Sequence, residues 1–277
     1  MTFYGVRGST PCPCDTNRRY GANTACVALE VPGEDPIVFD IGTGLRFWGE
    51  TLPQDGSFHG AALVTHMHWD HVQGLPFFVP VDRHGASLDI YGPTPEEGPW
   101  GEVFEDLMRP PYFPVRPADL RGDIRFHDVN DDDLAFGSAK VKVRPVPHVG
   151  PTNGYRVEWE GVKVAYLSDH QQPPDGTSIT DAALELADGA DLLIHDAQYR
   201  PDEFEVKSHW GHCTIDYALH VAREAGAHTV ALFHHDPGHD DDEMDRIVEE
   251  GRRAAEKLGG IDEVIGAAEG LTICYER

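Results

Sequence analysis

Apolar residues occur along this chain in short runs that polar, glycine or proline residues interrupt. Such runs are typical of strands rather than of long helices. The expected strands lie near residues 2–6, 25–31, 36–40, 61–65, 88–91, 140–147, 154–159, 162–168, 190–195 and 228–233. This pattern alone predicts a mixed α/β fold with strands gathered in each half of the chain.

Two stretches show helical spacing instead. The first begins at Thr214, a residue type that caps helix N-termini, and ends at Gly226, a residue type that ends helices. The second follows three acidic residues at 240–242 and carries apolar residues through Met244 and Val248. Both helices therefore belong to the C-terminal part of the fold.

The chain has 277 residues, of which 40% are hydrophobic, enough for a sizeable core. No linker, low-complexity tract or repeat interrupts it, so we expect a single domain over residues 1–277. The N-terminus lacks a basic and apolar leader, and no apolar stretch reaches the roughly 20 residues that span a bilayer. The chain has five cysteines, an odd number without the spacing of a disulfide framework, which suits a reducing compartment. We expect a soluble, cytoplasmic protein, with Cys12 and Cys14 as incidental loop thiols rather than a metal or redox pair.

The formal net charge is −26, with 22 basic against 48 acidic residues. Polyanion binding depends on lysine and arginine, so this balance disfavours large nucleic acids as partners. Acidity also accompanies adaptation to high salt, where dissolved ions screen the repulsion between the surface and a phosphate backbone beyond a few ångström.

The segment from Thr65 to His71 places three imidazoles and one carboxylate directly after an apolar run. At alternate positions, His66 and His68 point the same way and can share one ion, while Asp70 and His71 turn toward a neighbouring one. Imidazole and carboxylate suit zinc, and the cluster exceeds what one tetrahedral ion takes from a single segment. The segment therefore predicts a two-metal site, against the alternative of polar surface histidines in a chain that has 16.

The pattern His-x-His-x-Asp-His resembles the signature of the metallo-β-lactamase-fold hydrolases. That resemblance implies a four-layer αββα sandwich and a site with seven ligands in two sets. These would be His66, His68 and His148 for the first ion, Asp70, His71 and His234 for the second, and Asp169 as the bridge. Independently of the family, these residues follow apolar strand-like runs, so one edge of the sheets would present them on adjacent loops.

Three further residues need placing. His235 directly follows His234, and the family pattern favours His234 as the ligand, with the two side chains on opposite sides of a strand. Asp40 resembles the family's acidic residue beneath the metal loop, where it would anchor backbone or ligand imidazoles. His170 is expected to support the site from behind or to lie at the surface.

Two stretches are similar to motifs of ribonuclease Z-like phosphodiesterases. Residues 192–197, Leu-Leu-Ile-His-Asp-Ala, resemble their His-Glu-Ala stretch, and 211–214, Gly-His-Cys-Thr, resemble their Gly-His-Ser-Thr stretch. The resemblance implies that Asp196 orients His212, which would protonate a leaving alkoxide. The alternative for His212 is a surface residue before a helix. Asp196 replaces glutamate and Cys213 replaces serine, which leaves the geometry of the pair open.

Residues from about 72 to 128 form an expected insert that would set substrate choice. Arg109 could bind a phosphate oxygen, and Tyr112 and Phe113 could stack a base or sugar. Phe77 and Phe78 could line the same substrate pocket or form an apolar cover over the core of the sandwich. The start of the chain, residues 5–11, and the Tyr-Phe-Pro at 112–114 look like the bacterial and archaeal phosphodiesterase-like branch, whose members open small cyclic phosphodiesters.

We therefore expect a phosphodiesterase with two Zn²⁺ ions, or Mn²⁺ or Fe²⁺ instead, acting on a cyclic nucleotide or cyclic phosphoribose. Asp70, His212 and Asp196 would be the catalytic residues, with Asp70 orienting the nucleophile. A lactone or carboxyl-ester hydrolase and a ribonuclease Z-like transfer-RNA 3′-processing endonuclease are the alternatives, and a non-catalytic sensor is disfavoured by the complete ligand set. No membrane partner is expected, and a homodimer is allowed.

Overall fold

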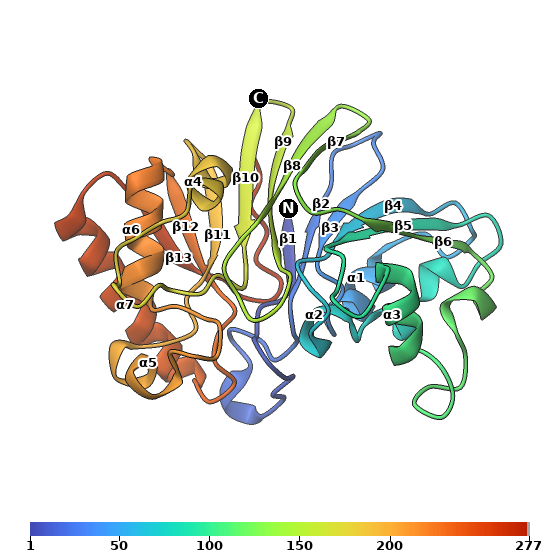
Figure 1. The fold of residues 1–277 in the computed structure, drawn as a ribbon, viewed down its shortest axis with the longest axis horizontal. Helices are drawn as coiled ribbons and strands as arrows, with labels where there is room; N and C mark the ends of the chain where they lie inside the picture. The colour runs from blue at the N-terminus through green and yellow to red at the C-terminus, as the bar shows by residue number, and fades with distance from the viewer. Residues whose placement is uncertain (276–277) are drawn as a thin grey trace.

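Two β-sheets form the centre of the molecule (Figure 1). The computed structural model describes residues 1–275. The first sheet follows chain order and consists of β1 (Thr2–Gly5), β2 (Cys26–Leu29), β3 (Ile37–Phe39), β4 (His59–Leu63), β5 (Ser87–Gly92) and β6 (Asp123–Asp128). Its first two pairings are antiparallel, and from β3 to β6 the strands run parallel.

The second sheet has seven strands, in the order β13 to β7. These are β7 (Asp132–Phe136), β8 (Ala139–Pro145), β9 (Asn153–Trp159), β10 (Val162–Leu167), β11 (Leu192–Asp196), β12 (Thr229–Phe233) and β13 (Glu263–Gly266). Strands β10 to β13 are parallel to each other, whereas β7, β8, β9 and β10 alternate in direction. Strand β8 therefore points the same way as β10, and the two strands end at the same edge of the sheet.

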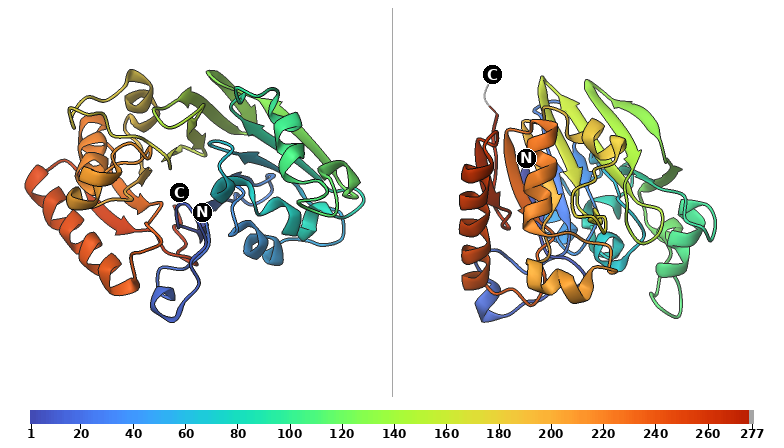
Figure 2. Two further views of the ribbon diagram at one scale, coloured as in Figure 1. Left: turned by 60° about the horizontal axis from the view of Figure 1, so that its bottom comes forward. Right: turned by 60° about the vertical axis from the view of Figure 1, so that its left-hand side comes forward.

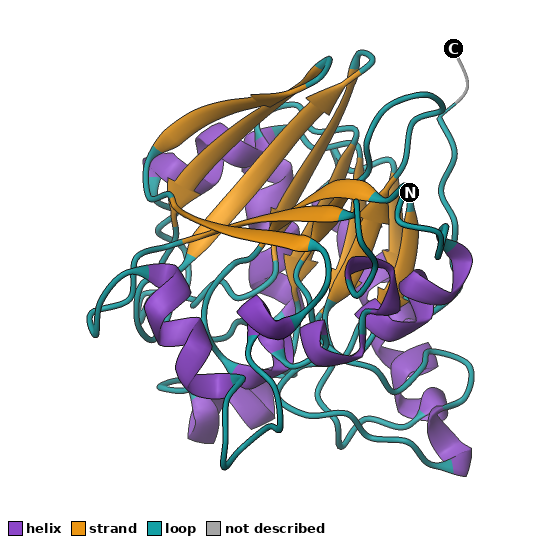
Figure 3. Cartoon of the chain, turned by 90° about the vertical axis from the view of Figure 1, so that its right-hand side faces the viewer, coloured by secondary structure: helices purple, strands orange, loops and turns teal. Residues whose placement is uncertain are grey.

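Helices cover the outer face of each sheet (Figure 2). On the first sheet lie α1 (Leu45–Thr51), α2 (Trp69–Val72) and α3 (Trp100–Leu107). On the second lie α4 (Asp181–Ala187), α6 (Ile215–Ala225) and α7 (Asp241–Leu258), while α5 (Pro201–Lys207) buries none of its residues. Helices and loops gather at one end of the sheets (Figure 3).

The inner faces of the two sheets pack on each other through aromatic and branched side chains. Phe39 of β3 stacks on Tyr166 of β10 with ring centroids 4.6 Å apart and planes 5° apart. Separate apolar clusters fill the space between each sheet and its helices. The predicted four-layer αββα sandwich is thus confirmed.

The structure also shows where the sequence pattern was incomplete. Strands β6, β7 and β13 were not expected, and two strands of the first sheet, β5 and β6, come from the stretch 72–128 that we expected to be an insert. Both expected helices are present. Thr214 accepts a hydrogen bond from the Tyr217 amide at 3.2 Å, and Gly226 ends α6 with φ +67°. No helix in residues 1–275 is long and apolar enough to cross a membrane.

Candidate metal centre

Strand ends bring the expected ligands together. His66 to His71 follow β4 and enter α2, His148 follows β8, Asp169 follows β10, and His234 follows β12. Parallel strands present the residues after their carboxyl ends at one edge of a sheet, so segments up to 168 residues apart in sequence can meet there. The side chains of all seven predicted ligands lie in overlapping groups whose donor atoms are within 4.8 Å of one another.

The first group consists of three imidazoles, those of His66, His68 and His148. His66 Nε2 lies 2.7 Å from His68 Nδ1, and His148 Nε2 lies 3.4 Å from that same atom. His148 donates from Nδ1 to the Gly211 carbonyl at 2.7 Å, which leaves its Nε2 as the unprotonated donor. Three nitrogens thus converge on one point, as an ion with imidazole ligands requires.

The second group joins two imidazoles and two carboxylates. His71 Nε2 lies 3.2 Å from Asp70 Oδ2 and 3.1 Å from Asp169 Oδ2. His234 Nε2 lies 3.2 Å and 3.3 Å from the same two oxygens. Asp169 spans both groups, because its other oxygen, Oδ1, faces His66 Nε2 at 3.9 Å and His148 Nε2 at 3.6 Å. The carboxylate therefore has the placement of a bridging ligand.

Buried groups behind the ligands hold these orientations. Asp40, fully buried with φ +53°, accepts hydrogen bonds from His71 Nδ1 and the Tyr166 hydroxyl, both at 2.8 Å. It also accepts from the Thr65 amide at 2.8 Å and from the Thr65 hydroxyl. Because Nδ1 of His71 donates to Asp40, its Nε2 is directed at the two site carboxylates.

The two adjacent histidines after β12 point in different directions. His234, with φ +58°, turns its Nε2 into the second group. His235 donates from Nε2 to the Ala267 carbonyl at 2.8 Å and so points away from the site. The geometry favours His234 as the ligand. His170 is fully buried rather than at the surface, and its Nδ1 lies 3.0 Å from His195 Nε2.

The N-terminal loop contributes contacts that sequence reasoning missed. The Ser9 amide donates to Asp70 Oδ2 at 2.7 Å, and a Cβ added at Gly8 would lie 2.5 Å from the ring of His234. Arg7 is buried and anchors the loop through hydrogen bonds to the Gly21 and His239 carbonyls at 2.8 and 2.7 Å. Apart from Arg7–Gly21, these contacts join residues more than 60 positions apart, and only the Gly-Ser pair in the sequence hints at them.

Electrostatics also suit cation binding. Burial lowers the pKa of His66, His68 and His148 below the usual imidazole value, which favours the neutral, ligating form. Burial opposes ionisation of Asp169, yet its pKa is held well below the usual range by His234 and His71. Nε2 of His71 is buried and without a hydrogen bond, facing two carboxylates. Paired nitrogen sets around a shared carboxylate are a donor set that fits two divalent ions.

A histidine–aspartate pair lies beside the second group. His212 Nδ1 is 2.8 Å from Asp196 Oδ2, and the His212 ring stacks on His234 with centroids 4.9 Å apart. Cys213 donates from Sγ to the Asp196 carbonyl at 2.9 Å, so the thiol supports the strand end that carries Asp196. Burial raises the pKa of Asp196 well above its usual range and lowers that of His212.

The three expected substrate residues are placed differently from one another. Tyr112 and Phe113 line a cavity of about 590 Å³ next to α2. Arg109 does not line it: its Nε donates to Asp106 at 2.7 Å, and its guanidinium lies over the Tyr112 ring at 5.8 Å. Phe77 borders the cavity, whereas Phe78 is buried in the core.

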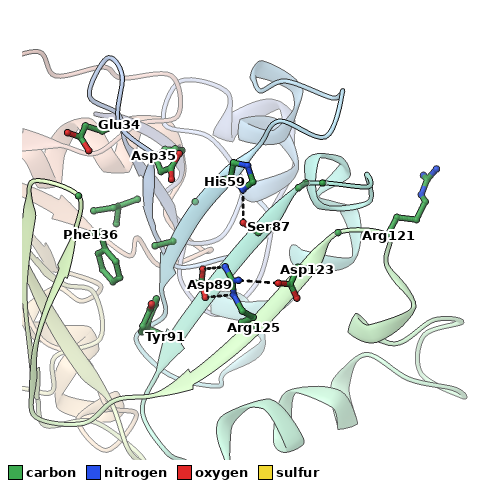
Figure 4. Close-up of a pocket in the computed structure, with 18 residues that line it drawn as sticks. Glu34, Asp35, His59, Ser87, Asp89, Tyr91, Arg121, Asp123, Arg125 and Phe136 are labelled. Carbon is green, nitrogen blue, oxygen red and sulfur yellow. Dashed lines mark hydrogen bonds and ion pairs between the residues drawn. The ribbon is translucent and has the colours of Figure 1, made fainter.

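A larger cavity, about 840 Å³, lies elsewhere (Figure 4). It opens at the starts of β3, β4 and β6, away from the strand ends that carry the metal ligands. Its lining residues therefore lie at the opposite ends of these strands from the metal-binding segment. Three of its charged side chains pair with each other, because Arg125 contacts both Asp89 and Asp123.

A profile described as the beta-lactamase superfamily domain matches residues 38–235, a span that contains all seven clustered donors. The chain belongs to this superfamily. The curated relatives include Ribonuclease Z of Synechococcus sp. strain WH7803, 29% identical over 86% of this chain and 85% of that protein. Ribonuclease Z of Natronomonas pharaonis is 26% identical over 84% and 86%.

Solved structures agree on the fold of this superfamily member. The metallo-beta-lactamase fold protein YhfI from Bacillus subtilis has a TM-score of 0.72 at 20% identity, covering 98% of this chain and 96% of that one. A diphosphatase of the PhnP family has a TM-score of 0.69 at 23% identity, covering 99% and 97%. Human tRNase Z, short form, has a TM-score of 0.69 at 20% identity, covering 99% and 98%. The chain is a metal-dependent hydrolase of the metallo-β-lactamase superfamily, in its Ribonuclease Z-like branch.

Proposed function

We propose that this protein is a phosphodiesterase with two metal ions that hydrolyses a small phosphodiester such as a cyclic nucleotide or a cyclic phosphoribose. The observation that carries the proposal is the His212–Asp196 pair, 2.8 Å apart, beside the double donor set. An unactivated alkoxide leaves only with a proton, and such a pair can supply it. Hydrolysis of a lactone has less need of a proton donor for its leaving group.

The ions, held by the seven clustered residues, would supply Lewis acidity to the phosphoryl oxygens and a nucleophile at neutral pH. Zn²⁺ suits the imidazole-rich first group, and Mn²⁺ or Fe²⁺ would suit the carboxylates of the second. Asp70, fixed by the Ser9 amide, orients the attacking group. The five cysteines are all free, which fits a reducing, cytoplasmic setting.

His212 and Asp196 handle the leaving group's proton. Asp196 accepts a hydrogen bond from the Gln198 amide at 3.0 Å and lies 2.8 Å from His212 Nδ1, so its carboxylate orients the imidazole through an Nδ1–H hydrogen bond. In its protonated form His212 carries a second proton on Nε2, which would pass to the departing oxygen. The leaving oxygen gains one proton and His212 loses one, with its Nδ1–H still held by Asp196.

The names of the curated relatives favour a second candidate, a transfer-RNA 3′-processing endonuclease. The net charge of −26 argues against it, because a polynucleotide needs basic contacts for its phosphates. Arg109 and Lys207, which lie in loop and helix segments near the site, are already paired with Asp106 and Asp236.

A substrate panel tests the proposal. The protein loaded with zinc or manganese is assayed on cyclic mononucleotides, cyclic phosphoribose, bis(p-nitrophenyl) phosphate, a homoserine lactone and a precursor transfer RNA. We expect turnover of a small cyclic phosphodiester to exceed that of the transfer RNA by orders of magnitude. Site-specific trimming of the transfer RNA without activity on the small diesters would establish the endonuclease instead.

A further inference from the structure

Exposed apolar side chains flank the metal ligands on three different segments of the chain. Trp69, between the ligands His68 and Asp70, is 72% exposed. Val149, which follows His148, is 50% exposed, and Trp210, which lies two positions before His212, is 54% exposed. Large apolar groups exposed beside a cluster of metal-binding side chains indicate a surface that binds a ligand or partner.

One side of this apolar surface is a cavity of about 590 Å³, within the size range of small-molecule sites. Trp69, Phe77, Met108 and Phe113 line it, and the ring of Phe77 meets that of Phe113 edge-on with centroids 5.9 Å apart. Phe77 is 57% exposed, so part of its face is open to a ligand. The cavity therefore offers flat apolar faces for stacking.

The cavity is also without free charge. Asp106 is the one charged residue in its lining, and its carboxylate accepts the hydrogen bond from Arg109 at 2.7 Å. A phosphate group would find no cation there that is not already paired, whereas an uncharged ring would lose no hydrogen bonds to the wall. Charge thus divides the site, with the anion held at the metal centre and an uncharged group held next to it.

The cavity adjoins the metal-binding segment, because Trp69 and Val72, which line it, are sequence neighbours of the ligands Asp70 and His71. The Cα of Trp69 is one peptide unit, about 3.8 Å, from the Cα atoms of two metal ligands. A phosphodiester held at the cluster could extend one of its two ester groups over Trp69 toward Phe77.

Resting on the proposed phosphodiesterase function, we propose that this cavity binds an uncharged aromatic or apolar ester group of the substrate. The substrate class is then a phosphodiester with one flat apolar substituent, such as a nucleobase-bearing ester, rather than a plain sugar phosphate. Trp69 and Phe77 determine this specificity by stacking on that group.

Binding of phosphate monoesters, the products of such a reaction, tests the proposal without requiring turnover. The probes are methyl phosphate and 1-naphthylmethyl phosphate, titrated calorimetrically into the zinc-loaded protein. Both place the same dianion at the metals and differ only in the apolar group. We expect the naphthylmethyl ester to bind at least about 10-fold tighter, in line with the stacking energy of one aromatic ring.

The variants Trp69→Ala and Phe77→Ala should each reduce that ratio to about 3-fold or less. Phe77 does not adjoin a metal ligand, so its variant tests the cavity even if Trp69→Ala disturbs the ions. The control Phe47→Ala removes an exposed aromatic side chain of α1 outside the cavity and should leave the ratio unchanged.

Equal affinities of the two probes for the wild-type protein would overturn the proposal, and so would a ratio unaffected by both variants. If analytical ultracentrifugation shows a dimer that Trp69→Ala dissociates, the apolar surface binds a second copy of the chain and the proposal is wrong. Failure of the proposed function shows separately, as absence of hydrolysis of every diester in the panel.

Discussion

At the scale of single residues, the site depends on hydrogen bonds that select one nitrogen of each imidazole. His71 donates to Asp40 and His148 to the Gly211 carbonyl, so each turns its other nitrogen to the cluster. His212 is oriented in the same way, because its Nδ1 lies 2.8 Å from the buried carboxyl of Asp196. The group behind each ring thus selects the nitrogen that faces the site.

The role of His212 predicts a dependence on the leaving group. His212→Ala should lower kcat/KM for a diester with an alkyl leaving group by roughly 10²-fold, because that alkoxide needs a proton. A nitrophenyl diester, which leaves without protonation, should lose far less. Asp196→Asn should show the same selectivity more weakly. Parallel losses on both substrates would assign His212 a structural or phosphate-binding role.

Gly8 predicts an effect on metal content. In Gly8→Ala the new Cβ would lie 2.5 Å from the His234 ring, closer than real contacts allow, so this ligand must move. We expect one ion to bind about 10–100-fold more weakly, as when groups behind a ligand are altered. The number of zinc ions per chain that remain after dialysis measures this loss. Ser9→Ala is the control, because it keeps the backbone amide that donates to Asp70. If Gly8→Ala still held two ions tightly, the close approach of Gly8 to His234 would not matter for metal binding.

At the scale of elements, residue spacing predicted the metal loop, the strand ends and α6 with its caps. It did not predict β6 or β7, because their charged residues obscure the apolar pattern: β6 reads Asp-Ile-Arg-Phe-His-Asp, with Arg125 paired to Asp89 of β5. The Ser9–Asp70 contact could not be read from spacing either, since it forms only when the chain folds. Local pattern thus indicates which residues can bind a metal, and tertiary contacts orient them.

The link between α4 and β8 allows a stability prediction. Arg144 donates to Glu185 at 2.9 Å and, with Lys142, lowers the pKa of Glu185 from 4.5 to about 2. The ionised carboxylate therefore stabilises the fold above pH 4.5, and this contribution is lost as the pH falls toward 2. The pair is partly exposed, so Glu185→Gln should lower the free energy of unfolding by only about 0.5 kcal/mol at neutral pH. Urea unfolding should show the two proteins converging in acid; a constant difference from pH 7 to pH 2 would contradict the assignment.

At the scale of the whole molecule, the net charge of −26 acts against any anionic substrate. Salt screens this repulsion over about 10 Å at 0.1 M ionic strength, so kcat/KM for a cyclic mononucleotide should rise between about 10 and 200 mM KCl. Sucrose at matched osmolarity serves as the control. An enzyme that holds a polyanion through basic contacts would instead lose activity steeply with salt. A fall in kcat/KM for the small substrate with rising salt would contradict the claim that the net negative charge repels it.

The central claim is that seven residues from four strand ends hold two ions, and metal analysis tests it most directly. Protein reloaded with zinc or manganese and dialysed should contain two ions per chain by elemental analysis. Asp169→Ala should fall below that, because Asp169 Oδ1 faces one group of imidazoles and Oδ2 faces the other. One ion or none in the wild-type protein, or two ions retained in Asp169→Ala, would contradict the account.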